Sequence, residues 1–148
     1  MTAKDIMQTN VLHIKKDMLV RDIAKLLLEN KISGVPVLDD DGKVIGVVTE
    51  NDLIIKDKEP SFPSYIGILG SIIFLEGVKR YDEELRKLAA MTAEEIMTKK
   101  VYTIKEDTPV EEIASIMVEK GVNRVPVVDE EGILVGIVSR ADMLKTIL

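Results

Sequence analysis

The sequence predicts an α/β (α+β) protein made of two copies of one β-α-β-β-α unit. The chain repeats itself at an offset of about 90 residues, and the segments that close the two copies, GVVTEND at 46–52 and GIVSRAD at 136–142, share one pattern. Each copy also changes from short apolar β runs to a run with helical period and back. A unit of about 50 residues buries too little surface to be stable alone, so the copies are expected to pack face to face.

Each copy begins with a short β run, VLHI at 11–14 and VYTI at 101–104. A helix follows, in which apolar residues recur at helical spacing: Val20, Ile23, Ala24 and Leu27. In the second copy Thr108 suits the N-cap, Pro109 the first helical position and Glu111 the acid of a capping box. Gly121 lies just past the expected end of the helix.

Two more β runs follow in each copy, VPVLD at 35–39 and KVIGVV at 43–48 in the first. The connection contains Asp41-Gly42, which is a hairpin signal. Its three aspartates lack the alternating ligands and distant glutamate of a calcium loop, so a solvated turn is expected. A last helix begins at Thr49 in one copy and at Ser139 in the other.

An insert at 58–91 separates repeat 1 (residues 1–57) from repeat 2 (residues 92–148). Prolines and glycines interrupt its apolar first part, and EGVKRYDEELRKLAA at 76–90 predicts an amphipathic helix. The insert is interpreted as a linker packed on the core. The alternative is that residues 65–75 and the following helix form a surface for a second subunit.

Composition excludes several classes of function. Hydrophobic residues make up 46% and charged residues 31%, as in ordinary folded proteins, and the absence of cysteine removes disulfide and thiolate chemistry. A net charge of −6 disfavours nucleic-acid binding. The N-terminus does not resemble a signal peptide, and YIGILGSIIFL at 65–75 is too short to cross a bilayer, so we expect a cytoplasmic protein without membrane contact. Because His13 is the only histidine, neither a catalytic triad nor a metal site is expected, and the protein is predicted not to be an enzyme.

The hydroxyl and carboxylate that begin each last helix allow two interpretations. Thr49 with Asp52, and Ser139 with Asp142, have the spacing of a capping box. They also suit a ligand site, because free helix amides bind phosphate and an acid can accept the hydroxyls of a ribose. A glycine inside each preceding β run, at 46 and 136, favours the second interpretation, because glycine weakens a strand unless a group approaches its backbone closely.

These features resemble the CBS (cystathionine β-synthase type) domain, present as a tandem pair known as a Bateman module. The resemblance rests on IMT with a following V-x-T-I, on GVNRVPVVD, and on GIVSxxD, all clearest in the second copy. It covers nearly the whole chain except the insert. The first copy differs, with KISGVPVLD in place of GVNRVPVVD and His13 in place of Thr103.

The resemblance implies two repeats packed as a pseudo-twofold disc, with two clefts that bind AMP, ADP, ATP or S-adenosylmethionine as an effector. It places ribose on Asp52 and Asp142, and phosphate on Thr49 and Ser139. The first cleft would combine Val47, Thr49 and Asp52 with Thr103, Asn123, Arg124 and Pro126. The second would combine Ile137, Ser139 and Asp142 with His13, Ser33, Gly34 and Pro36.

The two clefts are expected to differ in charge, because residue 50 is Glu and residue 140 is Arg. We predict that the cleft with Arg140 accepts the more highly phosphorylated nucleotide and that the other prefers AMP or adenosine, or stays empty, although Arg124 would offset Glu50. The function expected is ligand sensing without catalysis, in a homodimer or through a separate effector protein. An assembly module with vestigial clefts is the main alternative.

Overall fold

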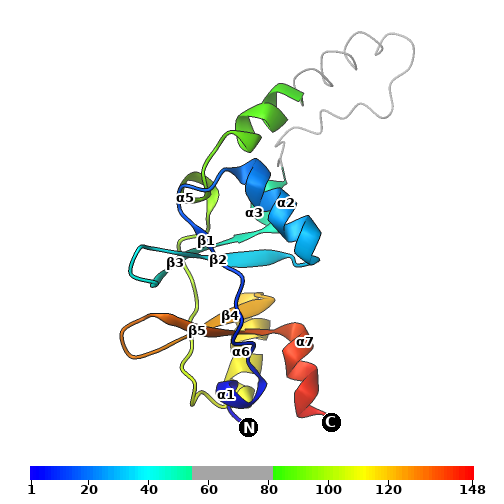
Figure 1. Cartoon of the computed structure of the whole chain (residues 1–148). Helices are drawn as coiled ribbons and strands as arrows, with labels where there is room; N and C mark the ends of the chain where they lie inside the picture. The colour runs from blue at the N-terminus through cyan, green and yellow to red at the C-terminus, as the bar shows by residue number, and fades with distance from the viewer. Residues whose placement is uncertain (55–81) are drawn as a thin grey trace, which may run out of the picture.

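The computed structural model of the chain describes residues 1–54 and 82–148. Two sheets lie one above the other (Figure 1). The first contains β1 (Ile14–Lys15), β2 (Gly34–Leu38) and β3 (Val44–Thr49), and the second contains β4 (Arg124–Val128) and β5 (Leu134–Ser139). β1 pairs with β2 in parallel, whereas β2–β3 and β4–β5 are antiparallel hairpins. The hairpins predicted from both copies are thereby confirmed.

The long helix of each copy packs on its sheet through one apolar face. α2 (Val20–Asn30) buries Val20, Ile23 and Leu27, as its spacing predicts. α6 (Val110–Lys120) ends at Gly121, whose φ of 63° is the left-handed conformation that glycine adopts without strain. The predicted start was wrong: Pro109 is the N-cap, no side chain caps α6, and the Thr108 hydroxyl instead accepts a hydrogen bond from Lys105 N at 3.0 Å.

The first β run of each copy is shorter than the sequence predicts. Leu12 and His13 are exposed, and pairing in the first sheet begins only at the buried Ile14. In the second copy Ile104 alone forms a parallel bridge, to Val127. The apolar pattern there gives each copy one buried isoleucine rather than a full strand.

The loop between the two hairpin strands is a tight turn in each copy. Asp39 Oδ1 accepts hydrogen bonds from Asp41 N and Lys43 N, both at 2.9 Å, and Gly42 has a φ of 87°. Asp129 holds the second turn in the same way. The solvated turn is therefore observed, and its carboxylate binds its own main chain.

Four short helices complete the two copies: α1 (Ala3–Ile6), α3 (Glu50–Leu53), α5 (Ala93–Ile96) and α7 (Arg140–Met143), the last followed by η2 (Leu144–Thr146). Residues 82–89 are also helical, in agreement with the end of the predicted amphipathic helix. The rest of that helix, and the surface proposed at 65–75, lie outside the described residues.

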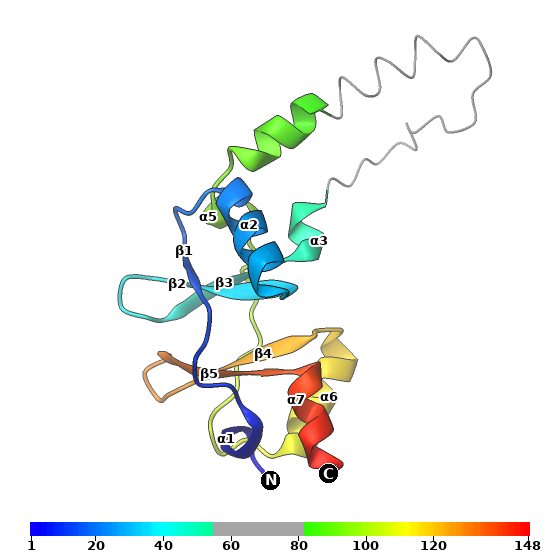
Figure 2. The ribbon, with the colours of Figure 1, turned by 45° about the vertical axis from the view of Figure 1, so that its right-hand side comes forward.

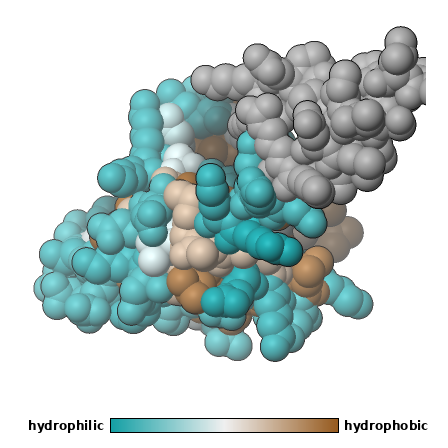
Figure 3. Space-filling view, turned by 90° about the horizontal axis from the view of Figure 1, so that it is seen from above, coloured by the Kyte–Doolittle hydropathy of each residue, from teal (hydrophilic) through white to brown (hydrophobic). Residues whose placement is uncertain are grey.

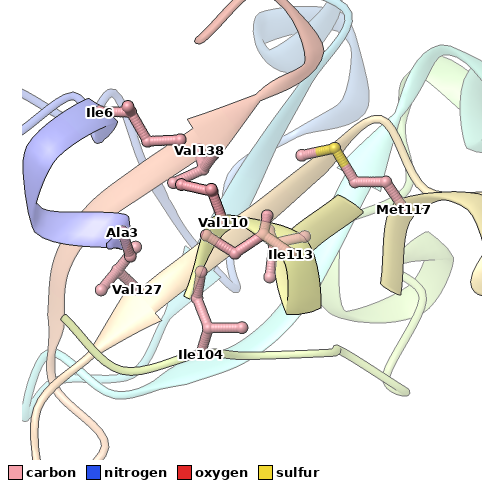
Figure 4. Close-up of a cluster of buried hydrophobic side chains, with 9 residues drawn as sticks. Ala3, Ile6, Ile104, Val110, Ile113, Met117, Val127 and Val138 are labelled. Atoms are coloured by element: carbon pink, nitrogen blue, oxygen red, sulfur yellow. The ribbon is translucent and has the colours of Figure 1, made fainter. Parts of the chain in front are cut away.

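The two hydrophobic cores exchange their first helices. α1 lies beside α6, and α5 lies beside α2 (Figure 2). Ala3 and Ile6 are thus packed with Ile113, Val127 and other residues of the second copy (Figure 4), while Ala93 belongs to the first core. Two backbone hydrogen bonds, Ala3 N to Thr108 O and Ala93 N to Met18 O, both at 2.9 Å, hold the exchanged helices in place. Each packed unit therefore contains the beginning of one sequence copy and the body of the other.

Hydrophilic side chains cover most of the described surface seen from above, with apolar ones gathered near its middle (Figure 3). Among residues 1–54 and 82–148, no helix has both the length and the apolar character needed to cross a membrane.

Candidate functional site

Each copy has a junction at which a strand passes directly into a short helix. Thr49 is the N-cap of α3, and its amide donates to Asp52 Oδ2 at 2.8 Å. Ser139 is the N-cap of α7, and its amide donates to Asp142 Oδ2 at the same distance. Both pairs are therefore capping boxes. Each carboxylate caps the N-terminus of a short helix, and each also lines a cavity.

The junctions offer fewer free amides than the sequence suggests. Glu50 N, the first amide of α3, donates to Ser33 O at 2.9 Å, and Arg140 N donates to Asn123 O at 3.0 Å. These bonds extend each hairpin by one step into the helix. The expected phosphate cradle of helix amides is reduced accordingly, and polar side chains must supply more of any anion contact.

Methionine side chains explain the glycines at positions 46 and 136. A Cβ on Gly46 would collide with the side chain of Met97, and a Cβ on Gly136 would lie 2.6 Å from Met7 Sδ and 3.1 Å from Gln8 O. The close approach predicted from these glycines therefore exists, but the group that approaches belongs to the protein. The glycines are not evidence for a ligand, because they make room for the exchanged segments.

A cavity of about 520 Å³ lies beside the first junction. It combines the end of one copy with the middle of the other, and its lining includes these predicted residues: Val47, Thr49, Asp52, Asn123, Arg124 and Pro126. Thr103 is exposed and lies outside the lining.

A second cavity of about 770 Å³ lies beside the other junction, and its lining includes these predicted residues: Ser33, Gly34, Ile137, Ser139, Arg140 and Asp142. Two predicted residues are not in this lining. His13 is exposed with its Nδ1 3.0 Å from Val11 O, and Pro36 is fully buried. Both cavities have volumes in the range of about 300–1,000 Å³ that small-molecule sites usually have.

Arg124 lies between the two cavities. Its guanidinium donates to the Ser33 hydroxyl and occupies the space left by Gly34, where a Cβ would lie 2.5 Å from Nη1. Burial lowers the pKa of Arg124, and the charge of Glu50 partly offsets that effect.

Arg124 and Glu50 line both cavities. The charge difference predicted from residues 50 and 140 is therefore smaller than two units, because Glu50 lines both cavities and Arg140 lines only the second. Among the described residues, Lys100 lines only the first cavity, whereas Lys31 and Arg140 line only the second. The second cavity therefore keeps one more cation, and its preference for the more highly phosphorylated nucleotide stays a prediction.

The two junction carboxylates differ in their surroundings. Asp142 is 4% exposed, and its Oδ1 accepts hydrogen bonds from Gln8 Nε2 at 2.8 Å and from Lys145 Nζ at 3.2 Å. Asp52 is partly exposed, and its Oδ1 accepts a hydrogen bond from Thr98 Oγ1 at 3.2 Å.

Sequence reasoning did not select Gln8, Thr98 or Lys145 as site residues. Gln8 and Thr98 follow an Ile-Met pair in each copy, so the repeat itself was a signal that could have found the first two. Tyr102 was also not predicted from the sequence, although it lines the first cavity. The Nζ atom of Lys100 lies 5.8 Å from the centre of its ring, and the Nζ atom of Lys120 lies 5.5 Å from it.

Comparison with known proteins gives consistent results. Residues 3–59 and 93–148 match the CBS domain. The protein MJ1426 of Methanocaldococcus jannaschii is 32% identical over 155 residues, which cover 100% of this chain and 92% of that protein. The chloroplastic protein CBSX1 of Arabidopsis thaliana is 33% identical over 144 residues, which cover 93% of this chain and 59% of that protein.

Solved structures share the fold. CBSX2 of Arabidopsis thaliana, crystallised with AMP, superposes with a TM-score of 0.72 at 25% identity and covers 99% of this chain and 95% of its own. The CBS domain pair of MJ0100, crystallised with 5′-methylthioadenosine and S-adenosyl-L-methionine, gives 0.71 at 26% identity, with coverages of 99% and 95%. The chain belongs to the CBS domain family, as a tandem pair with the mixed helix and strand fold that its sequence predicts.

Proposed function

We propose that this CBS pair is a regulatory module that binds an adenosyl ligand in its two cavities without changing it chemically. The observation that carries the proposal is the composition of each cavity. A carboxylate and a hydroxyl at a strand-to-helix junction of one copy face polar and cationic groups of the other copy. Crystals of related CBS pairs contain AMP, 5′-methylthioadenosine and S-adenosylmethionine, which supports an adenosyl ligand for this chain.

The residues would divide the ligand between them. Asp52 and Asp142 would accept hydrogen bonds from the ribose hydroxyls, since a carboxylate is an acceptor only. The base would pack against Val47 in one cavity and Ile137 in the other. A phosphate, or the charged end of another adenosyl ligand such as ADP, ATP or S-adenosylmethionine, would reach Arg124 and the Thr49 or Ser139 hydroxyl.

A thermal melting series tests the proposal. Any ligand that binds only the folded protein at about a hundred times its dissociation constant adds about 2.7 kcal/mol to the free energy of unfolding. For a chain of this size, the melting temperature should rise by about 5–10 °C. AMP, ADP, ATP and S-adenosylmethionine should be compared with inosine monophosphate and with inorganic phosphate.

The double variant Asp52→Asn/Asp142→Asn is the matched control, because Asn keeps the shape and can still accept a hydrogen bond from the N-cap amide. Its melting temperature should respond much less to the adenosyl ligand that stabilises the wild type. No stabilisation of the wild type by any of the four adenosyl ligands would contradict the proposal.

One observation favours the alternative of a pure assembly module. Each carboxylate already accepts a hydrogen bond from its own N-cap amide, so the junctions are satisfied without a ligand. A pure assembly module would show no change in melting temperature with any nucleotide, so the thermal melting series separates the two functions.

A ligand signal must pass to another surface, because a ligand shifts a conformational equilibrium only by its differential affinity for the two states. Homodimer formation and a separate effector protein remain predictions. Light scattering with and without the stabilising ligand would show whether the molar mass corresponds to a dimer and whether it changes.

A further inference from the structure

One of the equivalent positions at which the two cavities differ is held by Gln8 in the second cavity and by Thr98 in the first. Gln8 exchanges backbone hydrogen bonds of 2.9 and 3.0 Å with Ile137, and Thr98 exchanges bonds of the same lengths with Val47. Because both main chains are held in the same way, the difference between the cavities at this place lies in the side chains.

In the second cavity, the acceptor positions of Asp142 are occupied. Its Oδ1 accepts from Gln8 Nε2 at 2.8 Å and from Lys145 Nζ at 3.2 Å. Its Oδ2 accepts from the amide and hydroxyl of Ser139 at 2.8 and 2.9 Å. An ionised carboxylate has about four lone-pair positions, so a sugar hydroxyl must displace a donor to bind here.

In the first cavity, Asp52 accepts fewer hydrogen bonds from residues 1–54 and 82–148 than Asp142 does. Its Oδ2 accepts from the Thr49 amide at 2.8 Å and from the hydroxyl at 3.3 Å, and its Oδ1 accepts from Thr98 at 3.2 Å. The residue equivalent to Lys145 is Ile55, which has no side-chain donor. Of the hydrogen bonds that the described part of the chain makes to Asp52 Oδ1, a sugar hydroxyl would have to displace at most the long, neutral one from Thr98.

We propose that the residue at positions 8 and 98 decides which cavity accepts ribose. Thr98 leaves Asp52 available, so the first cavity fills first. Gln8, together with Lys145, occupies Asp142, so the second cavity binds the same ligand more weakly. This inference rests on the proposed function and adds an order of filling to it.

The size of the effect follows from the bonds that must break. A hydrogen bond to a charged group corresponds to about tenfold or more in a binding constant. We therefore expect the second cavity to bind adenosine at least about tenfold more weakly than the first. Adenosine is the suitable probe, because it has the ribose hydroxyls and no phosphate that would add contacts to Arg124 or Arg140.

Reciprocal exchange of the two side chains tests the inference by calorimetric titration. Asp52→Asn isolates the second cavity, and adding Gln8→Thr should tighten adenosine binding there by about tenfold. Asp142→Asn isolates the first cavity, and adding Thr98→Gln should weaken it by a similar factor. Gln8 and Thr98 are both exposed, so the exchanges should preserve the fold, and melting without ligand verifies this.

Two controls make the result specific. 2′-Deoxyadenosine, which has one ribose hydroxyl fewer, should respond less to both exchanges. Lys145→Met should also tighten adenosine binding in the second cavity, because it frees the same oxygen as Gln8→Thr.

Each result decides a different point. Equal adenosine affinity at the two cavities of the wild type, or no effect of the exchanges, would overturn the order of filling and leave adenosyl binding intact. If adenosine, AMP, ADP, ATP and S-adenosylmethionine all fail to bind the wild type, the proposed function falls, and the order of filling falls with it.

Discussion

Asp142 is buried beside a cavity and is nevertheless stabilised as an anion. Burial raises the pKa of its carboxyl group, but hydrogen bonds from Gln8, Ser139 and Lys145 together outweigh burial, and the net pKa lies below the usual value. The charge is thus maintained by the same donors that restrict access to the carboxylate. At the scale of single residues, stability and ligand access are in competition at this position.

This competition makes the stability of the protein depend on pH. Because the pKa of Asp142 is lower in the folded than in the unfolded chain, its contribution is complete above the unfolded value of about 4 and is lost as the pH falls through the folded value. Asp142→Asn should cost about 2 kcal/mol at pH 7, where the donors lose their charged acceptor.

Urea unfolding at pH 7, 5, 4 and 3 measures this effect. The gap in unfolding free energy between wild type and Asp142→Asn should be the same at pH 7 and pH 5 and should narrow between pH 4 and pH 3. A gap that stays constant over this range would show that the carboxylate charge does not contribute to stability.

Residue patterns predicted the part of each cavity formed by a strand-to-helix junction better than the part contributed by the other copy. Asp52, Thr49 and their counterparts were recognisable because a hydroxyl, two variable residues and an acid recur in both copies. Thr103 and His13, which were assigned through the resemblance to the family, are exposed and lie outside the two linings, because pairing in each copy begins only at Ile14 or Ile104. Gln8 and Thr98 reach the carboxylates only through bridges to a strand far away in the sequence.

Among the elements, the exchanged helices have the largest consequence for the fold. α1 begins the first copy in sequence but is buried in the second core, where Ile6 is 1% exposed. An exchange of this kind ties the copies together, because neither core is complete without a segment from the other. It also places residues 8 and 98, which follow α1 and α5, at the cavities.

We predict that Ile6→Ala destabilises the second core, although Ile6 belongs to the first copy in sequence. Removing a buried isoleucine side chain down to Cβ should cost about 2–5 kcal/mol of unfolding free energy. Hydrogen exchange should then accelerate in β4 and β5 more than in β2 and β3.

Ile96→Ala, at the equivalent position of α5, is the reciprocal control. Ile96 packs against the first core, so that variant should have the larger effect on β2 and β3. Faster exchange of β2 and β3 in the Ile6 variant would contradict the exchanged packing.

At the scale of the whole molecule, Arg124 breaks the symmetry of the duplication. The equivalent residue of the first copy is Gly34, and the absence of a side chain there provides the space that the guanidinium fills. One cation therefore lines both cavities, where a symmetric pair would have two.

We expect Arg124→Met to weaken AMP binding in both cavities by about tenfold or more, because a charge-assisted contact to phosphate is lost. Adenosine, without phosphate, should bind the variant nearly as well as the wild type. Arg140→Met is the matched control, and it should affect AMP only in the second cavity, the one that Arg140 lines. Calorimetric titration with both ligands measures these differences, and an equal loss of AMP and adenosine would indicate that Arg124 acts through packing alone.

The sequence by itself determined the duplication, the hairpins, the apolar faces of α2 and α6, and the two capping boxes. These features depend on contacts between residues close in the chain or on the pattern of one element. Only the tertiary structure decided the exchange of α1 and α5, the meaning of the glycines at 46 and 136, the shared position of Arg124 and the unequal surroundings of Asp52 and Asp142. Those depend on contacts between segments far apart in the chain, such as the 46 residues that separate Asp52 from Thr98, and no local pattern specifies them.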